Sequence, residues 1–172
     1  MTEDLEALRP AHVLETDRLL LRPFTAEELD AVAAGGTAEH FAAGFPGPED
    51  VDFARESLLA GGYFSTESVY ARLAVLEKAS GQVVGTAGFV GPPIDAELEV
   101  VGSLAAGRRN RGYAQEAIAA LLRVAFADPS VTAVRASVPE DNAPAAQVLV
   151  AAGFVRREGP GLQIDYVLPR PA

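Results

Sequence analysis

Three arginines lie within four residues of one another in a chain that is otherwise acidic. Arg108, Arg109 and Arg111 are followed at once by Gly112, where the apolar pattern predicts the start of a long helix. A helix start offers backbone N–H groups without partners and a partial positive charge. Glycine permits a backbone conformation or a close approach that a β-carbon would block, and arginine adds charge-assisted hydrogen bonds to phosphate oxygens. The segment predicts a cradle for pyrophosphate, although solvated arginines on a surface loop would have the same sequence.

Several other chemistries are excluded or disfavoured. The chain has no cysteine, and so no disulfide, thiolate nucleophile or cysteine-ligated zinc. No Ser-His-Asp arrangement is evident, since His12 precedes the predicted core and His40 lies in a Gly/Ala-rich segment between predicted helices. A dinucleotide-binding loop would need G-x-G-x-x-G directly after a strand that opens a βαβ unit. Here the loop comes late, and Gly107 and Gly112 have the wrong spacing.

The elements that must position this loop follow from the spacing of apolar residues. Strands are predicted over residues 17–24, 69–78, 82–90, 97–104, 131–138, 154–157 and 162–168. Helices are predicted from residue 25 to 35–36, from about 48 to 61–62, from about 112 to 127, and from 142 to just before 153. Thr25 and Glu28 fit a capping box, and Asn142 fits an N-cap. A glycine inside 97–104 suggests a bulge or a close backbone approach.

These elements predict an α/β, more strictly α+β, domain with a mixed, largely antiparallel sheet and four helices. No repeat or long linker divides the chain, so we expect a single domain over residues 1–172, with residues 1–15 as a loose lead-in. At 172 residues the chain is long enough to bury a core without disulfides or metals.

The charge composition limits the classes of partner that we expect for this chain. Aspartate and glutamate outnumber lysine and arginine 24 to 14, for a formal net charge of −10. Such a surface repels nucleic acid and anionic membranes, so neither is expected as a partner. The acidic opening residues do not form a secretory signal, and no apolar run approaches the roughly 20 residues that span a bilayer. We expect a soluble, cytoplasmic protein and leave a homodimer open.

The cradle also resembles a known signature. Arg109-Asn110-Arg111-Gly112-Tyr113-Ala114 is similar to the R/Q-x-x-G-x-G/A pattern with which GNAT N-acetyltransferases bind the pyrophosphate of coenzyme A. Blocks similar to the family's opening strand, third strand and closing Gly-Phe segment occur in the same order, at residues 14–23, 84–89 and 141–154. Over residues 14–168 the chain resembles the Rim-type branch, whose members acetylate amines.

The resemblance implies a function and a set of site residues. It implies direct transfer of an acetyl group from acetyl-CoA to a primary amine, with no metal. The acetyl-pantetheine arm would lie in a gap beside residues 102–106, where strands splay apart. The cofactor-binding residues would be Leu104, Ala106, Arg109, Asn110, Arg111, Gly112, Tyr113, Ala114 and Asn142. Glu99 would remove a proton through water, with Glu97 on the same strand face as the second choice, unless both glutamates simply face solvent.

The general acid departs from the family's pattern. Relatives often carry a tyrosine four residues before the glycine of Gly-Phe, which here is Leu149. Rim-type relatives often carry a serine three residues after the asparagine, which here is Ala145. Neither side chain donates a proton. Three other side chains are candidate donors: Tyr113, Ser103 and Tyr166. A thiol pKa near 8.5 also makes coenzyme A a tolerable leaving group without an acid.

Two functions therefore follow from the sequence. One is a working N-acetyltransferase, and the other is a catalytically silent acyl-CoA-binding sensor or interaction module of the same fold. The acceptor stays open among protein N-termini, polyamines, aminoglycosides and amino acids. The two N-terminal helices, the loop at residues 91–95 and the last hairpin would shape its site.

Overall fold

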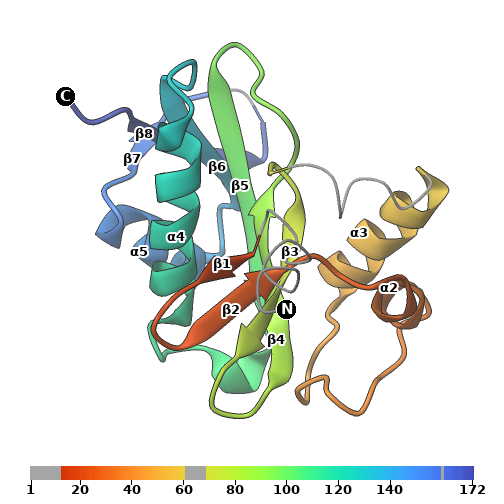
Figure 1. Ribbon diagram of the computed structural model, residues 1–172. Helices are drawn as coiled ribbons and strands as arrows, with labels where there is room; N and C mark the ends of the chain where they lie inside the picture. The colour runs from red at the N-terminus through yellow and green to blue at the C-terminus, as the bar shows by residue number, and fades with distance from the viewer. Residues whose placement is uncertain (1–12, 61–68, 160) are drawn as a thin grey trace, which may run out of the picture.

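A computed structural model describes residues 13–60, 69–159 and 161–172 (Figure 1). The strands are β1 (Leu14–Glu15), β2 (Leu19–Arg22), β3 (Arg72–Glu77), β4 (Gln82–Phe89), β5 (Glu97–Leu104), β6 (Ala133–Pro139), β7 (Val155–Arg157) and β8 (Gln163–Pro169). The helices are α2 (Ala26–Ala33), α3 (Pro48–Leu59), α4 (Tyr113–Ala127) and α5 (Ala143–Ala151), with a 3₁₀ turn η2 (Ala106–Arg108) before α4. None of the described helices is long and apolar enough to cross a bilayer.

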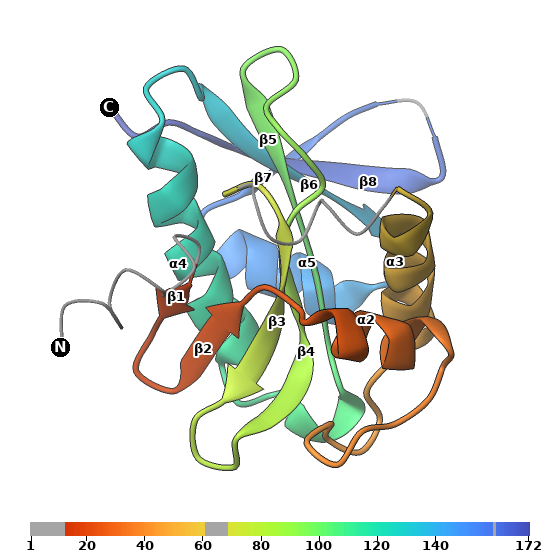
Figure 2. The ribbon, with the colours of Figure 1, turned by 45° about the vertical axis from the view of Figure 1, so that its right-hand side comes forward.

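The strands form one sheet in the order β1-β2-β3-β4-β5-β6-β8-β7 (Figure 2). Neighbouring strands are antiparallel except for β5 and β6, which are parallel and are connected through α4. The predicted fold class is confirmed: the sheet is mixed and largely antiparallel, and four α-helices of the described residues flank it.

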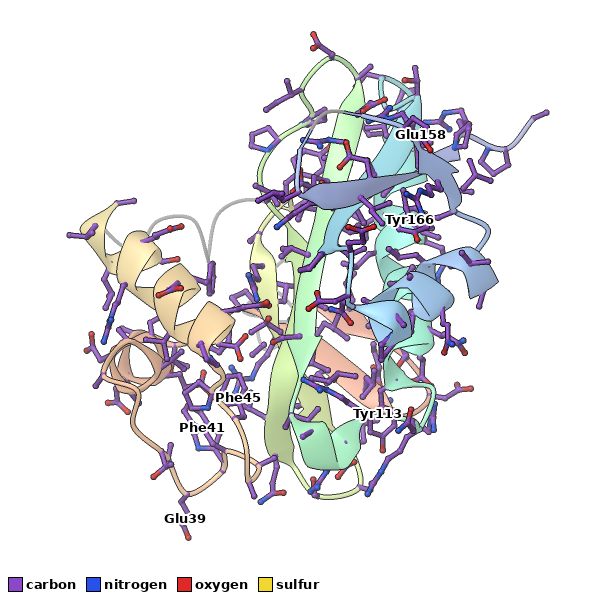
Figure 3. All side chains as sticks on the ribbon, turned by 180° about the vertical axis from the view of Figure 1, so that it is seen from behind. Glu39, Phe41, Phe45, Tyr113, Glu158 and Tyr166 are labelled. Atoms are coloured by element: carbon purple, nitrogen blue, oxygen red, sulfur yellow. The ribbon has the colours of Figure 1, made fainter. Side chains whose placement is uncertain are left out.

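Helices cover both faces of the sheet. The larger core packs α4 and α5, through Tyr113, Leu121 and Leu149, against buried strand residues such as Leu98 and Val134. The smaller core packs α2 and α3 against the opposite face. Figure 3 shows Phe41 and Phe45 on this α2–α3 side, and Tyr113 and Tyr166 on the other side. Central strands apolar on both faces are what such a two-sided arrangement requires.

Local signals set several helix ends where the sequence predicts them. The Thr25 side chain accepts from the Glu28 N–H, and the Glu28 carboxylate accepts from the Thr25 N–H, so the predicted capping box is present. The Asn142 side chain caps α5 by accepting from the Ala145 N–H. Gly153, just past the end of α5, has φ +100°, a conformation that favours glycine.

The structure refines other boundaries. Leu14 and Glu15, expected within a loose lead-in, pair with β2 as strand β1. Residues 1–12 and the expected end of the second helix at 61–62 lie outside the described residues. Gly102 marks a close backbone approach, because a β-carbon there would lie 2.8 Å from the Thr86 carbonyl oxygen. The register shift of the sheet falls elsewhere, between Val75 and Leu76.

Candidate functional site

Strands β5 and β6 lie side by side for three residues and then part. Their registered pairs join residues 97–99 of β5 to residues 133–135 of β6. Beyond this point residues 100–104 pair with β4 on one side only, and residues 136–139 pair with β8 on one side only. The strand edges that face each other across the opening therefore carry backbone N–H and C=O groups without strand partners. We call this opening, between residues 100–104 and 136–139, the fork.

The chain leaves the fork through a tight loop that ends at the start of α4. Asn110 (φ +63°) and Gly112 (φ +80°) are both left-handed, a conformation that asparagine and glycine tolerate best. Gly112 is the N-cap of α4 and makes no side-chain cap. Among the described residues, no acceptor receives a hydrogen bond from the N–H groups of residues 110–115. The loop therefore presents successive open donors at the positive end of a helix, which we call the cradle (residues 109–115).

The three arginines of this segment have different partners. Arg108 lies 3.3 Å from a Glu77 carboxylate oxygen and donates to the Gln82 side chain at 3.0 Å. Arg111 lies 3.5 Å from Glu77. Arg109 makes no ion pair among the described residues, and its Nε donates to the Leu104 carbonyl at 3.1 Å. The charge of Arg109 is thus free to pair with an anion, whereas Arg108 already bonds Glu77 of β3 and Gln82 of β4.

Glu77, at the end of β3, ties the cradle to the sheet. Its side chain is 6 % exposed and accepts from the Tyr113 hydroxyl at 2.8 Å and from the Ser80 hydroxyl at 2.7 Å. The Ser80 hydrogen bond does most to lower the pKa of Glu77, joined by those from Tyr113 and Arg108. The hydrogen bond to Glu77, together with burial, raises the pKa of Tyr113. A phenol whose proton is held by a carboxylate is a poor acid for a leaving thiolate.

Arg18 also contacts the cradle, and no local sequence pattern predicts this contact. Its guanidinium lies 4.6 Å from the Tyr113 ring centroid and donates to the Arg111 carbonyl at 2.8 Å. Its Nε forms an ion pair with Glu116 at 2.8 Å, and the Thr16 hydroxyl donates to the same carboxylate. The two sequence blocks similar to the family's opening strand and cofactor helix are thereby joined.

Glu99 lies at the apex of the fork. It belongs to the last registered β5–β6 pair and forms a 2.6 Å ion pair with Arg135, its partner in the register. Glu97 pairs with Arg157 at 2.8 Å, and that hydrogen bond lowers the pKa of Glu97. The Glu99–Arg135 ion pair joins β5 and β6 where they begin to part, so Glu99 has a structural contact whatever its part in chemistry.

A buried polar cluster on the α3 side of the sheet borders the fork. Asp50, at the start of α3, is 2 % exposed. Its carboxylate accepts from Ser103 of β5 at 2.6 Å, from Thr86 of β4 at 3.1 Å and from Arg72 of β3 at 3.4 Å. The sequence shows Asp50 only as one acid in an acidic helix start, so its place at the site could not be read from local pattern.

Three expected residues remain: Leu149 and Ala145, which cannot donate a proton, and Tyr166, which stays a candidate donor. Leu149 is buried in the larger core at 4 % exposure. Ala145 lies in the first turn of α5, and its N–H donates to Asn142 at 3.3 Å. Tyr166 of β8 pairs with Ala136 of β6 and is buried in the larger core.

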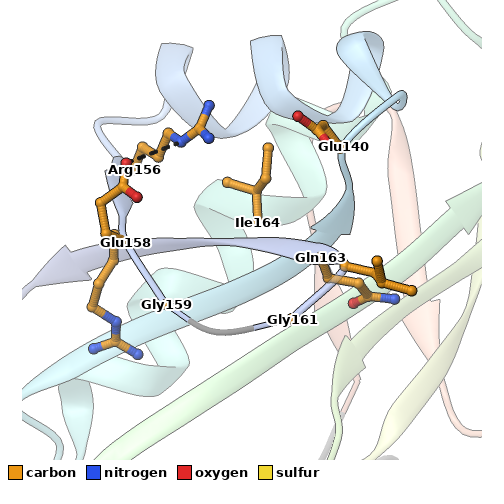
Figure 4. A pocket seen from close by; sticks show the side chains of 9 residues that line it. Glu140, Arg156, Glu158, Gly159, Gly161, Gln163 and Ile164 are labelled. Carbon is orange, nitrogen blue, oxygen red and sulfur yellow. Dashed lines mark ion pairs between the residues drawn. The ribbon is translucent and has the colours of Figure 1, made fainter.

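Two hollows adjoin the fork and the cradle without being lined by their residues. One of about 120 Å³ lies at the β7–β8 hairpin, where Arg156 approaches Glu158 (Figure 4). The other, of about 640 Å³, is lined by Glu15, Thr16, Asp17, Lys78, Glu116, Ala119 and Arg123. The described residues contain no group of His, Asp and Glu side chains suited to hold a metal ion.

Comparison with known proteins gives a family and a fold. A sequence model described as an acetyltransferase (GNAT) domain matches residues 18–155. A search of curated proteins found no match.

Solved structures share the fold over nearly the whole chain. An acetyltransferase from Agrobacterium tumefaciens has a TM-score of 0.65 and 23% identity, covering 92% of this chain and 94% of its own. A GNAT-family acetyltransferase from Bacillus anthracis has a TM-score of 0.64 and 19% identity, covering 91% and 98%. A ribosomal-protein-S5-alanine acetyltransferase from Vibrio fischeri has a TM-score of 0.61 and 15% identity, covering 91% and 96%. At these identities the likeness establishes the fold.

Proposed function

The chain belongs to the GNAT acetyltransferase family, and we propose that it transfers an acetyl group from acetyl-CoA directly to a primary amine. The observation that carries this proposal is the pairing of an open fork with an uncapped helix start. Both present backbone groups without partners, and the chain runs directly from one to the other through η2. These segments are largely exposed or half-buried, so water can satisfy their backbone groups in the free protein, and a ligand with matching donors and acceptors can replace that water.

The residues present fit coenzyme A. The open N–H groups of the cradle would hold the pyrophosphate, with Arg109 as the nearest arginine free of a carboxylate. The unpaired edge of β5 at residues 100–104 would hydrogen-bond the pantetheine amides, as a neighbouring strand would. Leu104, Ala106 and Ala114 present small or apolar side chains beside these groups. When bound, acetyl-CoA supplies the thioester from which the acetyl group is taken.

Proton handling falls to residues on the α3 side of the sheet. A lysine-like amine has a pKa near 10.4 and an α-amine one near 8, so the neutral nucleophile must be favoured at the site. Glu99 would take a proton through water from the apex of the fork. With Tyr113 held by Glu77 and with Leu149 and Ala145 unable to donate, the thiolate would take its proton from Tyr166 or leave without a dedicated side-chain acid.

Free-thiol release from acetyl-CoA, measured with a panel of amines, tests the proposal. The panel holds peptides with free alanine or serine N-termini, spermidine, an aminoglycoside and free amino acids, with an N-acetylated peptide as the blank. Release above the blank with at least one amine is expected. Tight binding of coenzyme A in calorimetry, with no thiol release in the presence of any amine, would instead favour the acyl-CoA-binding module. The absence of the family's tyrosine and serine is consistent with that alternative.

Among acceptors, we favour a protein N-terminus. The Rim-type resemblance of the opening strand supports this choice, and the structural neighbour from Vibrio fischeri is described as acting on an alanine of ribosomal protein S5. On this choice the free-alanine and free-serine peptides react faster than spermidine and the aminoglycoside. Faster release with either small molecule would reverse the preference.

The role of Glu99 is tested by a matched pair of variants. Glu99→Gln keeps the shape of the side chain and removes the base, so turnover is expected to fall by about a hundredfold while coenzyme A affinity stays nearly intact. Glu97→Gln removes a carboxylate from the same strand face but leaves turnover close to wild type. Equal turnover for wild type and Glu99→Gln across about pH 6 to 9 would show that Glu99 has only a structural role, through its ion pair with Arg135.

A further inference from the structure

We propose that Ser103 binds the N–H of the acceptor amine, and that Asp50 is the positioning residue that fixes the Ser103 hydroxyl for this purpose. The inference rests on the proposed acetyl transfer and deepens it by naming the residue that receives the amine. It also changes the role expected for Ser103 from proton donor to hydrogen-bond acceptor.

The hydrogen bonds around Asp50 fix where its donors point. One carboxylate oxygen, Oδ1, accepts from Ser103 at 2.6 Å, from Thr86 at 3.1 Å and from Arg72 at 3.4 Å. The other, Oδ2, accepts from the Gly47 N–H at 2.9 Å. At 2 % exposure the carboxylate has almost no access to water. Its hydrogen-bonding capacity is therefore met by the protein, as a buried charge requires.

The hydrogen bonds of the cluster use the hydroxyl proton of Ser103 but leave a lone pair of its oxygen free. The Thr86 oxygen receives the Arg72 Nε–H at 2.9 Å, so the Thr86 proton is directed to Asp50. The short 2.6 Å contact directs the Ser103 proton to the same carboxylate. Although the two hydroxyl oxygens are 3.2 Å apart, neither proton is then available for the other. A hydroxyl has one donor and two acceptor positions, so the Ser103 oxygen can only accept from a substrate.

The location of Ser103 matches this role. It lies in the open arm of the fork, paired with Thr86 of β4 and unpaired toward β6. Its side chain is half-buried and points to the α3 side of the sheet, the side that holds Glu99. Ser103 lies four positions after Glu99 on the same strand face, about 13 Å away at the usual rise. Ser103 is therefore the nearer of the two to the cradle.

The chemistry of acetyl transfer favours such a group. The amine nitrogen gains positive charge as its bond to the acetyl carbon forms, and its N–H becomes a stronger donor. An oxygen whose own proton is bound to a carboxylate stabilises that charge, and it does so without reorganising because Asp50 already holds it in place. Ser103 would thereby align the amine nitrogen with the acetyl carbon.

The test separates amine binding from cofactor binding. Ser103→Ala is expected to raise KM for the best amine of the panel about tenfold or more, and to weaken binding of that amine to the enzyme–coenzyme A complex by a similar factor in calorimetry. The dissociation constant for coenzyme A should not change. Ser103→Thr keeps the hydroxyl and should recover most of the amine affinity. Ser130→Ala removes a serine that also bonds an aspartate but lies in a remote turn, and it should match wild type.

Asp50→Asn provides a second arm. If the variant folds, as judged by its circular dichroism and unfolding midpoint, its amine KM should rise as in Ser103→Ala. If Ser103→Ala left the amine KM and the amine affinity unchanged, the inference would be overturned. A parallel loss of coenzyme A affinity would also overturn it, because Ser103 would then contact the cofactor. No thiol release by the wild type with any amine would overturn the proposed acetyl transfer itself, and the inference with it.

Discussion

Helices α2 and α4 begin in opposite ways. The start of α2 is closed by side chains: Thr25 and Glu28 exchange hydrogen bonds with each other's N–H groups. Glu28 is 4 % exposed and also accepts from Arg22 at 2.7 Å and from His40 at 2.7 Å. Burial would raise the pKa of Glu28, but the hydrogen bonds from Arg22, Thr25 and His40 outweigh it and lower that pKa to about 2. The N–H groups of Thr25 and Glu28 at this helix start therefore have acceptors within the protein.

The start of α4 has no such closure. Its N-cap is Gly112, which has no side chain, and the N–H groups of residues 110–115 find no acceptor among the described residues. Glycine at the N-cap stabilises a helix start less than a capping side chain does, by roughly a few tenths of a kcal/mol, and α4 forgoes this at the end nearest the fork. Polar side chains thus stabilise the start of α2, whereas the proposed function would use the free backbone donors of α4 to bind an anion.

The largest expected effect comes from closing the open helix start. Gly112→Val should abolish the stabilisation that coenzyme A gives, which for wild type at about 100 times its dissociation constant is roughly 2.7 kcal/mol. Because Gly112 has φ +80°, the variant should also lose about 1–2 kcal/mol in the free protein. Thermal unfolding with and without coenzyme A measures both terms.

Gly107→Val is the matched control in the same segment. A β-carbon at Gly107 meets no atom within 4 Å, so this variant should keep both its stability and its response to coenzyme A. A folded Gly112→Val protein that coenzyme A stabilises as strongly as wild type would move the anion site away from the cradle.

Opening the closed helix start should affect stability and not binding. The lowered pKa of Glu28 contributes stability at pH values above the ordinary value of 4.5, and this is lost as the pH falls toward about 2. The contribution is roughly 2–3 kcal/mol, allowing for solvent screening around the half-exposed His40. Glu28→Gln should therefore be less stable than wild type at pH 7, and the difference should shrink by pH 3 in urea unfolding.

Coenzyme A affinity of Glu28→Gln should match wild type. Glu27→Gln, an exposed neighbour in the same turn, should leave the unfolding curve unchanged at both pH values. If the gap between Glu28→Gln and wild type stayed constant from pH 7 to pH 3, the buried carboxylate would not be the origin of the acid sensitivity.

A smaller effect is expected from removing the free arginine of the cradle. Arg109→Ala should weaken coenzyme A binding by about tenfold to a hundredfold, the value of one charge-assisted hydrogen bond to phosphate. The fold should be unaffected, because Arg109 makes no ion pair among the described residues and bonds only the Leu104 carbonyl. Arg123→Ala, on the exposed face of α4, is the control for lost positive charge. Equal dissociation constants for Arg109→Ala and wild type in calorimetry would remove Arg109 from the site.

The closed and open helix starts also differ in how far they could be read from the sequence. The Thr25–Glu28 box involves residues three apart, so local spacing predicts it correctly. Local spacing also predicts the cradle, because its arginine, glycine and helix start are adjacent in the chain; its binding of pyrophosphate stays a prediction. Strand and helix existence followed from apolar periodicity, and the fold class was correct.

What sequence reasoning missed are contacts between distant residues. Asp50 and Ser103 are 53 residues apart, and Arg18 and Glu116 are 98 apart. Their meeting depends on strand order and register across β2 to β5 and on where α3 and α4 pack, which no local pattern encodes. For the same reason the ion pair of Glu99 with Arg135 could not be foreseen, since it needs the single parallel pairing of the sheet.

Amide hydrogen exchange with and without coenzyme A tests the central claim most directly. We expect coenzyme A to slow exchange at residues 110–115 of the cradle and 100–104 of the fork, because the ligand supplies acceptors for their backbone N–H groups. Exchange at the start of α2, around Glu28, should not respond. Coenzyme A binding that leaves the cradle and fork amides exchanging at their free rates, or that protects only other segments, would contradict the assignment of this site.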